Sequence, residues 1–173
     1  MRNLPHWQPA GKDVFITWRL NGSLPAHLKI PDSAGRRFRS FDRALDLAAA
    51  GPVWLMDPRV ATCVVAALHR GQAQEMFCLH AYVVMANHVH VLLEPRIPIA
   101  RITKIIKGAT AREANRILSL TGTRFWQDES FDHWIRNTPQ WHRIRAYIER
   151  NPVAAGRVQT PEEWPWSSAS RTQ

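Results

Sequence analysis

The 173-residue chain contains few cysteines and tyrosines, two of each, and it has no long apolar run. Cys63 and Cys78 show no CxxC spacing, which argues against a disulfide framework and favours reduced thiols. No stretch of about 18 apolar residues is present to cross a bilayer. The opening residues also lack the apolar segment of a secretory signal. We therefore expect a cytoplasmic protein with no membrane partner.

Acidic residues are also in the minority, with 14 Asp and Glu against 23 Lys and Arg, a formal net charge of +9. Such an excess favours a polyanionic partner, and nucleic acid is the obvious candidate. The alternative is a basic surface that only keeps soluble molecules apart. Hydrophobic residues make up 45% of the chain, enough for one domain with its own core. We expect a single domain over 1–173, with its core at about 13–152 and an irregular tail over 153–173.

Hydrophobic periodicity and turn residues predict an alternation of strands and helices. Strands are expected over 13–20, 75–85, 88–95 and about 130–135. Helices are expected at about 41–50, from Asp57-Pro58 to Gly71, after Pro98, and from Thr138 as N-cap to Asn151-Pro152. The order predicts an α+β fold, a ferredoxin-like βαββαβ core with an antiparallel sheet, plus a C-terminal helix.

Two local details follow from the same reading. Asn87 is expected to adopt a left-handed backbone in the tight turn between the two central strands. The helix after Pro98 is expected to bury one apolar stripe. Its members are Ile102, Ile105, Ile106, Ala109 and Ile117.

Two histidines interrupt an otherwise apolar strand. His88 and His90 are separated by one valine, so both project from the same face of the sheet. Two adjacent imidazoles can bind one metal ion. They can equally be hydrogen-bonded core residues, and the pair alone does not decide between these readings.

The last predicted helix carries a tyrosine and an amide one turn apart. Tyr147 and Asn151 share a helical face, Arg143 and Arg150 flank it, and an apolar stripe would fasten the helix to the sheet. Tyr147 could be an interface residue with a solvated hydroxyl. It could also be a nucleophile whose phenolate is favoured by nearby positive charge. Tyr82, inside a strand, fits core packing better.

Taken together, these residues suit phosphodiester chemistry. A metal held by the histidines would polarise a phosphate oxygen, arginines would hold neighbouring phosphates, and the phenol oxygen would attack phosphorus.

The segment VMANHVHVLLEP resembles the HUH motif (His, bulky hydrophobe, His) of single-tyrosine transposases, and AYIERNPVAAGRV resembles the segment with their catalytic tyrosine. Five more segments resemble landmarks of the REP-associated tyrosine transposases within that superfamily. They are ITWRLNGSLP, WLMDPRVA, IIKGATAREANR, FWQDESFDHWIRN and EEWPWSSA. The resemblance covers about 13–169, with the motifs in the family's order.

The resemblance implies that His88, His90 and Asn151 bind Mg²⁺ or Mn²⁺, and imidazole ligands favour Mn²⁺ of the two. It implies that Tyr147 attacks single-stranded DNA at a hairpin element, leaving a 5′-phosphotyrosine and a free 3′ hydroxyl. It further implies a bacterial, nucleoid-associated protein that acts as a monomer. Ala86 stands where the family usually has proline, which loosens the turn at a cost of about 1 kcal/mol or less.

Basic and aromatic side chains outside these motifs are candidates for DNA contact. The basic candidates are Arg36, Arg37, Arg39, Lys104, Lys107, Arg112, Arg143 and Arg150. Trp126, Trp164 and Trp166 are candidates for stacking on bases, whereas Trp18 and Trp134 are expected to be core residues. His80, His133 and His142 lack a partner spacing and are interpreted as structural.

Two other functions remain open from sequence. The protein could be a non-catalytic module that binds hairpin DNA, although an intact His, His, Tyr and Asn set argues against loss of activity. It could also be a metal hydrolase of small phosphoesters with water as nucleophile. The transposase predicts a covalent bond between Tyr147 and DNA, whereas the binding module and the hydrolase do not.

Overall fold

The computed structural model describes residues 11–24, 44–46 and 51–171. The strands are β1 (Val14–Arg19), β2 (Phe77–Val84), β3 (His88–Pro95) and β4 (Phe131–Trp134). The α-helices are α2 (Pro58–Ala73), α3 (Ile99–Ile117) and α4 (Thr138–Ala154), with 3-10 turns η1 (Trp54–Met56) and η2 (Pro161–Glu163). Residues 44–46 are helical, and the rest of the helix expected at 41–50 lies outside the described residues. Cys63 and Cys78 are free thiols.

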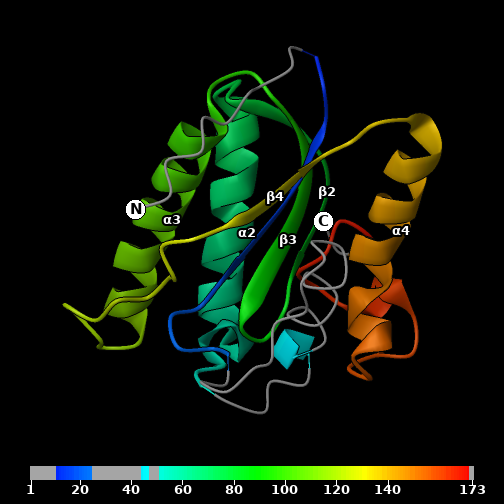
Figure 1. Cartoon of the computed structure of the whole chain (residues 1–173). Helices are drawn as coiled ribbons and strands as arrows, with labels where there is room; N and C mark the ends of the chain where they lie inside the picture. Colours follow the sequence, from blue (N-terminus) through cyan, green and yellow to red (C-terminus); the bar gives the residue numbers. More distant parts are fainter. Residues whose placement is uncertain (1–10, 25–43, 47–50, 172–173) are drawn as a thin grey trace.

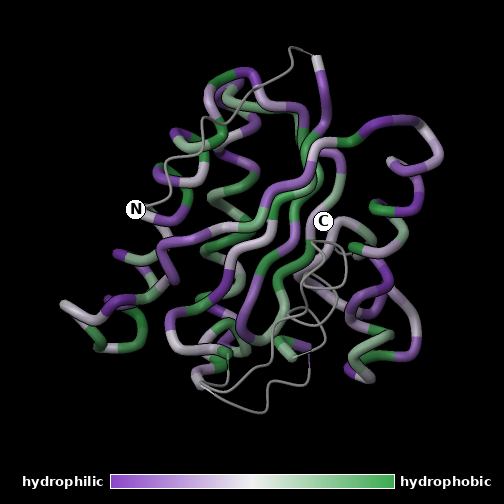
Figure 2. Tube along the Cα trace, in the orientation of Figure 1, coloured by the Kyte–Doolittle hydropathy of each residue, from purple (hydrophilic) through white to green (hydrophobic). Residues whose placement is uncertain are grey.

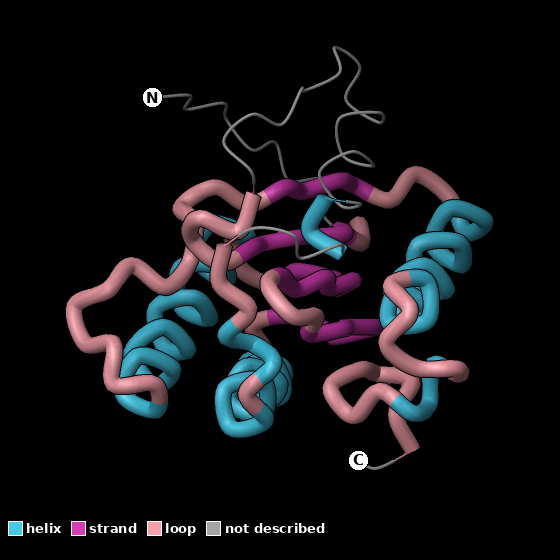
Figure 3. The backbone as a smooth tube through the Cα atoms, turned by 90° about the horizontal axis from the view of Figure 1, so that it is seen from below, coloured by secondary structure: helices cyan, strands magenta, loops and turns pink. Residues whose placement is uncertain are grey.

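The four strands form one antiparallel sheet in the order β2-β3-β1-β4. This order, with helices following β1 and β3, is the ferredoxin-like βαββαβ arrangement, so the predicted fold class is confirmed. Helices α2 and α3 cover one face of the sheet, and α4 lies against the other (Figure 1). Viewed along the layers, the strands lie between the two groups of helices (Figure 3).

Strand alternation divides the core into two clusters. Val89, Val91 and Leu93 of β3 point toward α2 and α3, whereas Leu92 joins Phe15 and Ile148 in the cluster under α4. Hydrophobic and hydrophilic stretches alternate along α3 and α4, as expected of helices that bury one face (Figure 2). Among the helices of the described residues, none combines the length and the apolar character needed to cross a membrane.

The expected apolar stripe of α3 is partly wrong. Ile102 and Ile106 are buried, but Ile105 is 40% exposed. The next buried positions, one and two turns after Ile106, are Thr110 and Ala114. A period of 3.6 residues rotates Ile105 out of the face that Ile102 and Ile106 share.

Helix α2 begins as the sequence predicts. Asp57 is the N-cap, its carboxylate accepts a hydrogen bond from the backbone N–H of Arg59, and Pro58 occupies the first turn. Helix α4 begins one residue earlier than predicted, because its N-cap is Asn137, whose side-chain oxygen accepts from the N–H of Gln140.

The predicted end of α4 at Pro152 is also wrong. A proline in the last turn removes one intrahelical hydrogen bond, and the helix continues to Ala154. It then ends in a Schellman motif, with Gly156 at φ +67° donating to Val153 and Arg157 donating to the Pro152 carbonyl. Because of this extension, Asn151 lies inside the helix rather than at its fraying end.

The tail after α4 is irregular, as expected, but it is fastened to the sheet. The N–H of Val84 donates to the carbonyl of Trp166, and the N–H of Ser168 donates to the carbonyl of Tyr82. The indole of Trp164 is 6% exposed and donates to the carbonyl of Val84. The tail therefore lies along β2.

The turn between β2 and β3 does not use a left-handed asparagine. The described non-glycine residues with positive φ are Glu75 and Ser119, so the expectation for Asn87 is wrong. Instead, backbone hydrogen bonds hold the turn in place: Leu20 donates to the Asn87 carbonyl and Leu55 donates to the Ala86 carbonyl. Ala86 is thus held by neighbouring segments although it lacks the ring of a proline.

Candidate active site

The two histidines of β3 lie on the face covered by α4. His88 and His90 are fully buried, at 0% exposure each. Across the β1–β3 pair, Arg19 is opposite His88 and Thr17 is opposite His90. The alternation of β3 therefore brings two polar rings into an otherwise apolar layer, where each needs a polar partner.

The outer nitrogen of each ring has such a partner. Nδ1 of His88 lies 2.8 Å from Oδ1 of Asn87, and Nδ1 of His90 lies 2.7 Å from Oγ1 of Thr17. An amide oxygen only accepts hydrogen bonds, so His88 carries its proton on Nδ1 and its Nε2 offers a lone pair. Asn87 thus sets the tautomer of the ring that follows it in the chain.

The inner nitrogens face each other. Nε2 of His88 lies 3.1 Å from Nε2 of His90, and the ring centroids are 4.6 Å apart. Two lone pairs repel at this distance, so a proton or a cation belongs between them. Burial, followed by the neighbouring charge of His90, holds the pKa of His88 well below its usual value. A neutral imidazole is the form that binds a metal.

The donor set fits a divalent cation. Two ligand atoms at adjacent positions around one ion are about 3.0 Å apart when each bond is about 2.1 Å, close to the observed 3.1 Å. Asn151 is 1% exposed, and neither its side-chain nitrogen nor its oxygen finds a hydrogen-bond partner among the described residues. An unsatisfied buried amide is costly, and a metal ligand role would explain it.

Tyr147 lies beside this pair. Its ring centroid is 5.6 Å from that of His90 and 6.1 Å, edge-on, from that of Phe15. Helix α4 is held there by fully buried Ile148 and by Trp141 and Ile144 in the same cluster. The phenolic oxygen is shielded from solvent. Residues separated by 57 positions in the chain are thus brought into ring contact.

The other tyrosine is a core residue, as the sequence predicts. Tyr82 is 2% exposed on the face covered by α2 and α3, and its hydroxyl lies 3.3 Å from Nε2 of His69. Burial raises the pKa of Tyr82. Tyr147 is therefore the phenol that lies on the histidine side of the sheet.

Two further charged residues lie near the histidines and were missed by sequence reasoning. Oδ1 of Asp46 is 3.6 Å from Nε2 of His88, and Arg19 is the strand neighbour of His88. Burial lowers the pKa of the Arg19 guanidinium, partly offset by Glu129. Antiparallel pairing of 13–20 with 88–95 could have revealed Arg19. The sequence carries no comparable signal for Asp46.

The structure separates the basic candidates for DNA contact. Arg101, Lys104 and Arg112 line one groove on α3, while Arg143 and Arg150 are exposed on α4. Because α3 and α4 cover opposite faces of the sheet, these two groups do not come together (Figure 1). The remaining candidates, Arg36, Arg37 and Arg39, lie outside the described residues.

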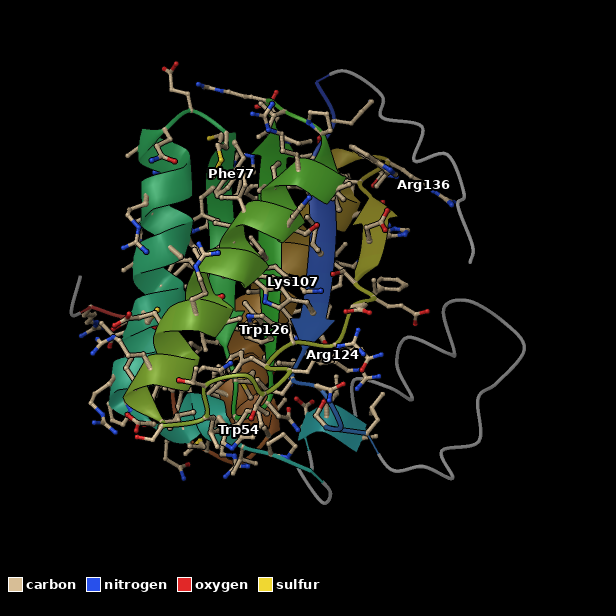
Figure 4. All side chains as sticks on the ribbon, turned by 90° about the vertical axis from the view of Figure 1, so that its left-hand side faces the viewer. Trp54, Phe77, Lys107, Arg124, Trp126 and Arg136 are labelled. Atoms are coloured by element: carbon tan, nitrogen blue, oxygen red, sulfur yellow. The ribbon has the colours of Figure 1, made fainter. Side chains whose placement is uncertain are left out.

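Lys107 has a structural role that the sequence did not predict. Its amino group donates to the carbonyls of Gln127 and Asp128, at 2.6 and 2.9 Å, and burial lowers its pKa. Lys107 extends from α3 toward the segment that carries Trp126 and Arg124 (Figure 4). Its charge holds this loop on α3, which argues against the expected DNA contact.

Two of the tryptophans expected to stack on bases are buried in the folded chain. Trp126 is 5% exposed, packs edge-on against Trp18 and donates from Nε1 to Oγ1 of Thr110. Trp164, in the tail, is buried in the cluster under α4, and Trp166 packs against it. At this burial, the rings of Trp126 and Trp164 offer little surface on which a base could stack. Trp18 is a core residue as predicted, and Trp134 is partly buried.

Residues 55–151 match the model of the IS200-like transposase family. The matched segment covers more than half of the chain and contains both histidines, Tyr147 and Asn151. The chain belongs to the IS200-like transposases. Among curated proteins, none matches it with statistical significance.

Two solved structures are similar to this chain. A REP-associated tyrosine transposase bound to a REP hairpin is 20% identical and has a TM-score of 0.64, over 97% of this chain and 82% of that one. A candidate transposase from Deinococcus radiodurans R1 is also 20% identical, with a TM-score of 0.47 over 87% of this chain and 98% of that one. At this identity, the first likeness shows the shared architecture of this IS200-like transposase.

Proposed function

We propose that this transposase cleaves and rejoins single-stranded DNA through a covalent bond to Tyr147, with a divalent cation, Mg²⁺ or Mn²⁺, held by His88, His90 and Asn151. The observation that carries the proposal is the contact between the Tyr147 and His90 rings, next to two Nε2 atoms that face each other at 3.1 Å. The proposed nucleophile and the proposed cation site thus lie side by side between the sheet and α4, shielded from solvent.

The chemistry follows from the position of the phenol. The Tyr147 oxygen attacks phosphorus, a bond from oxygen to phosphorus forms, and the bond to the 3′ oxygen breaks. The phenol gives up its proton and the departing 3′ oxygen gains one, leaving a 5′-phosphotyrosine and a 3′ hydroxyl. One phosphodiester replaces another, so a 3′ hydroxyl can reverse the step without external energy. The cation, when bound, polarises a non-bridging phosphate oxygen.

We propose that the substrate contains a hairpin of the REP type. The solved structure with a TM-score of 0.64 holds a REP hairpin on the same fold. The net charge of +9 suits a polyanion. Arg143 and Arg150, exposed on the helix that carries Tyr147, would contact phosphates near the cleaved bond. The groove lined by Lys104 and Arg112 would contact a more distant part of the DNA.

We further propose that one chain suffices for catalysis. Helix α4 packs on the sheet of its own chain, and Tyr147 contacts His90 of that chain. No exchange of helices between subunits is needed to bring these residues together. Light scattering of the covalent complex would test this, with a mass of one chain plus one oligonucleotide expected.

A labelled hairpin oligonucleotide with a single-stranded flank, incubated with Mn²⁺, tests the nucleophile. We expect a covalent protein–DNA adduct that resists denaturation, disappears in Tyr147→Phe and persists in the matched control Tyr82→Phe. Hairpin binding without an adduct in the wild type would instead indicate a binding module. Phosphoester turnover that survives Tyr147→Phe would indicate a hydrolase with water as nucleophile.

A further inference from the structure

A second group of metal-ligating side chains lies at the other end of the same sheet face. Ligand atoms of Asp13, His80 and Glu94 all lie within 4.8 Å of one another. Nε2 of His80 is 2.9 Å from Oδ1 of Asp13. Glu94 is four residues after His90 on β3, so the two groups are about 13 Å apart. Neither the proposed chemistry nor the DNA contacts use these three residues.

The backbone explains why the three side chains converge. Val14 pairs with Leu93 in the β1–β3 register, which places Asp13 opposite Glu94 on the face that α4 covers. The β2–β3 register shifts between Leu79 and Ala81, so His80 is the extra residue of a β-bulge. A bulge re-aims the side chain it carries. The His80 ring is turned toward α4, where it meets Trp141 edge-on at 5.6 Å.

The charges of this cluster favour a bound cation. Like charges directly opposite on neighbouring strands destabilise a sheet. Within the described part of the chain, no Lys or Arg forms an ion pair with Asp13 or Glu94, although the protein has many more basic than acidic residues. All three side chains are half-buried, and a cavity of about 360 Å³ borders Asp13 and Trp141. Lys12 and Arg136 also line this cavity, so an ion would reach the three ligands through their own solvent-exposed parts.

We propose that Asp13, His80 and Glu94 form a second divalent-cation site, suited to Mn²⁺ or Zn²⁺. The observed 2.9 Å between the imidazole nitrogen and the carboxylate oxygen is close to the separation of about 3.0 Å between adjacent ligands of an octahedral Mn²⁺, whereas a tetrahedral Zn²⁺ would separate them to about 3.4 Å. Imidazole with two carboxylates suits these ions better than Mg²⁺ or Ca²⁺, which take oxygen ligands.

Such an ion would join the ends of three strands under the first turns of α4. Asp13 precedes β1, His80 lies in β2 and Glu94 lies near the end of β3. Trp141, in contact with His80, lies six residues before Tyr147 on the same helix. The site is structural, and its ion holds the beginning of the tyrosine helix on the sheet.

Isothermal titration of chelator-treated protein with MnCl₂ and with ZnCl₂ tests the site. We expect two equivalents in the wild type and one in each of Glu94→Gln, His80→Ala and the double variant His88→Ala/His90→Ala. Glu75→Gln is the matched control, an exposed glutamate at the same end of the sheet, and should retain two. Bound Zn²⁺ should raise the melting temperature of His88→Ala/His90→Ala but not that of the same variant with Glu94→Gln.

The outcomes separate this site from the catalytic one. Wild-type stoichiometry in both Glu94→Gln and His80→Ala would show that Asp13 and His80 form an ion pair only, and the proposal would fall. Loss of one equivalent in these two variants, with none lost in His88→Ala/His90→Ala, would sustain this site and overturn the catalytic metal instead. Circular dichroism of each variant establishes that it is folded.

Discussion

Thr17 and His90 are 73 residues apart in the chain, yet the Thr17 hydroxyl oxygen lies 2.7 Å from Nδ1 of His90. The pairing of β1 with β3 creates this contact, because Thr17 and His90 are directly opposite in the register. The hydroxyl fixes the plane of the ring and directs Nε2 toward His88. A partner of this kind commonly governs how well an imidazole binds a metal.

Thr17→Val should weaken Mn²⁺ binding about 10- to 100-fold. Valine has nearly the same shape and favours strands, so the sheet should be preserved. Titration with Mn²⁺ measures the affinity, and Thr103→Val, whose hydroxyl only bonds carbonyls of its own helix, is the control. Equal affinity in Thr17→Val and wild type would show that the hydroxyl does not orient His90.

Asn151→Leu should stabilise the metal-free protein by about 1 kcal/mol while abolishing adduct formation. Leucine has the same branching and the same number of side-chain heavy atoms as asparagine, and it removes two buried polar atoms that lack partners among the described residues. Chemical denaturation in chelator measures the free energy of unfolding. Asn151→Asp, which keeps an oxygen ligand, should retain Mn²⁺ binding. A loss of stability in Asn151→Leu would mean that the amide is already satisfied in the folded protein.

The metal-free protein should lose stability as the pH falls through about 6.5. The pKa of His88 is lower in the folded state than in the unfolded state, first because of burial and then because of His90. Below about 6.5 the unfolded chain therefore binds a proton that the folded chain does not, and each such proton costs up to about 1.4 kcal/mol per pH unit. Denaturation in chelator between pH 5 and 8 should show this slope, and His88→Gln should reduce it. An unchanged slope in that variant would assign the effect to other groups.

Trp126→Phe should lower the free energy of unfolding by about 1 to 2 kcal/mol, since it loses buried area and the hydrogen bond to Thr110. Its affinity for a hairpin, measured on folded protein, should equal that of the wild type. Weaker DNA binding by folded Trp126→Phe would restore the stacking role.

Arg112→Gln should change DNA binding but not stability. Its free energy of unfolding should stay within about 0.5 kcal/mol of the wild-type value, and the salt dependence of hairpin binding should fall by about one phosphate contact.

Much of the fold was predictable because its signals are local. The alternation of β3 placed His88 and His90 on one face, and the Asp57-Pro58 pair marked the start of α2. The spacing of Tyr147 and Asn151 predicted a shared helical face.

Other features depend on contacts that no local pattern encodes. The burial of Trp126 depends on a hydroxyl in α3, and the position of His80 depends on a register shift. Asp46 comes close to His88 only when the chain is folded, and no spacing in the sequence indicates this contact.

The tail that lies along β2 covers part of the outer edge of the sheet. A strand at the border of a sheet presents unpaired amides and carbonyls that can recruit a strand from another molecule. The bonds from Val84 to Trp166 and from Ser168 to Tyr82 occupy part of that border. Truncation before Trp164 would leave it bare, and the shortened protein should self-associate even though every residue of the histidine and tyrosine cluster remains.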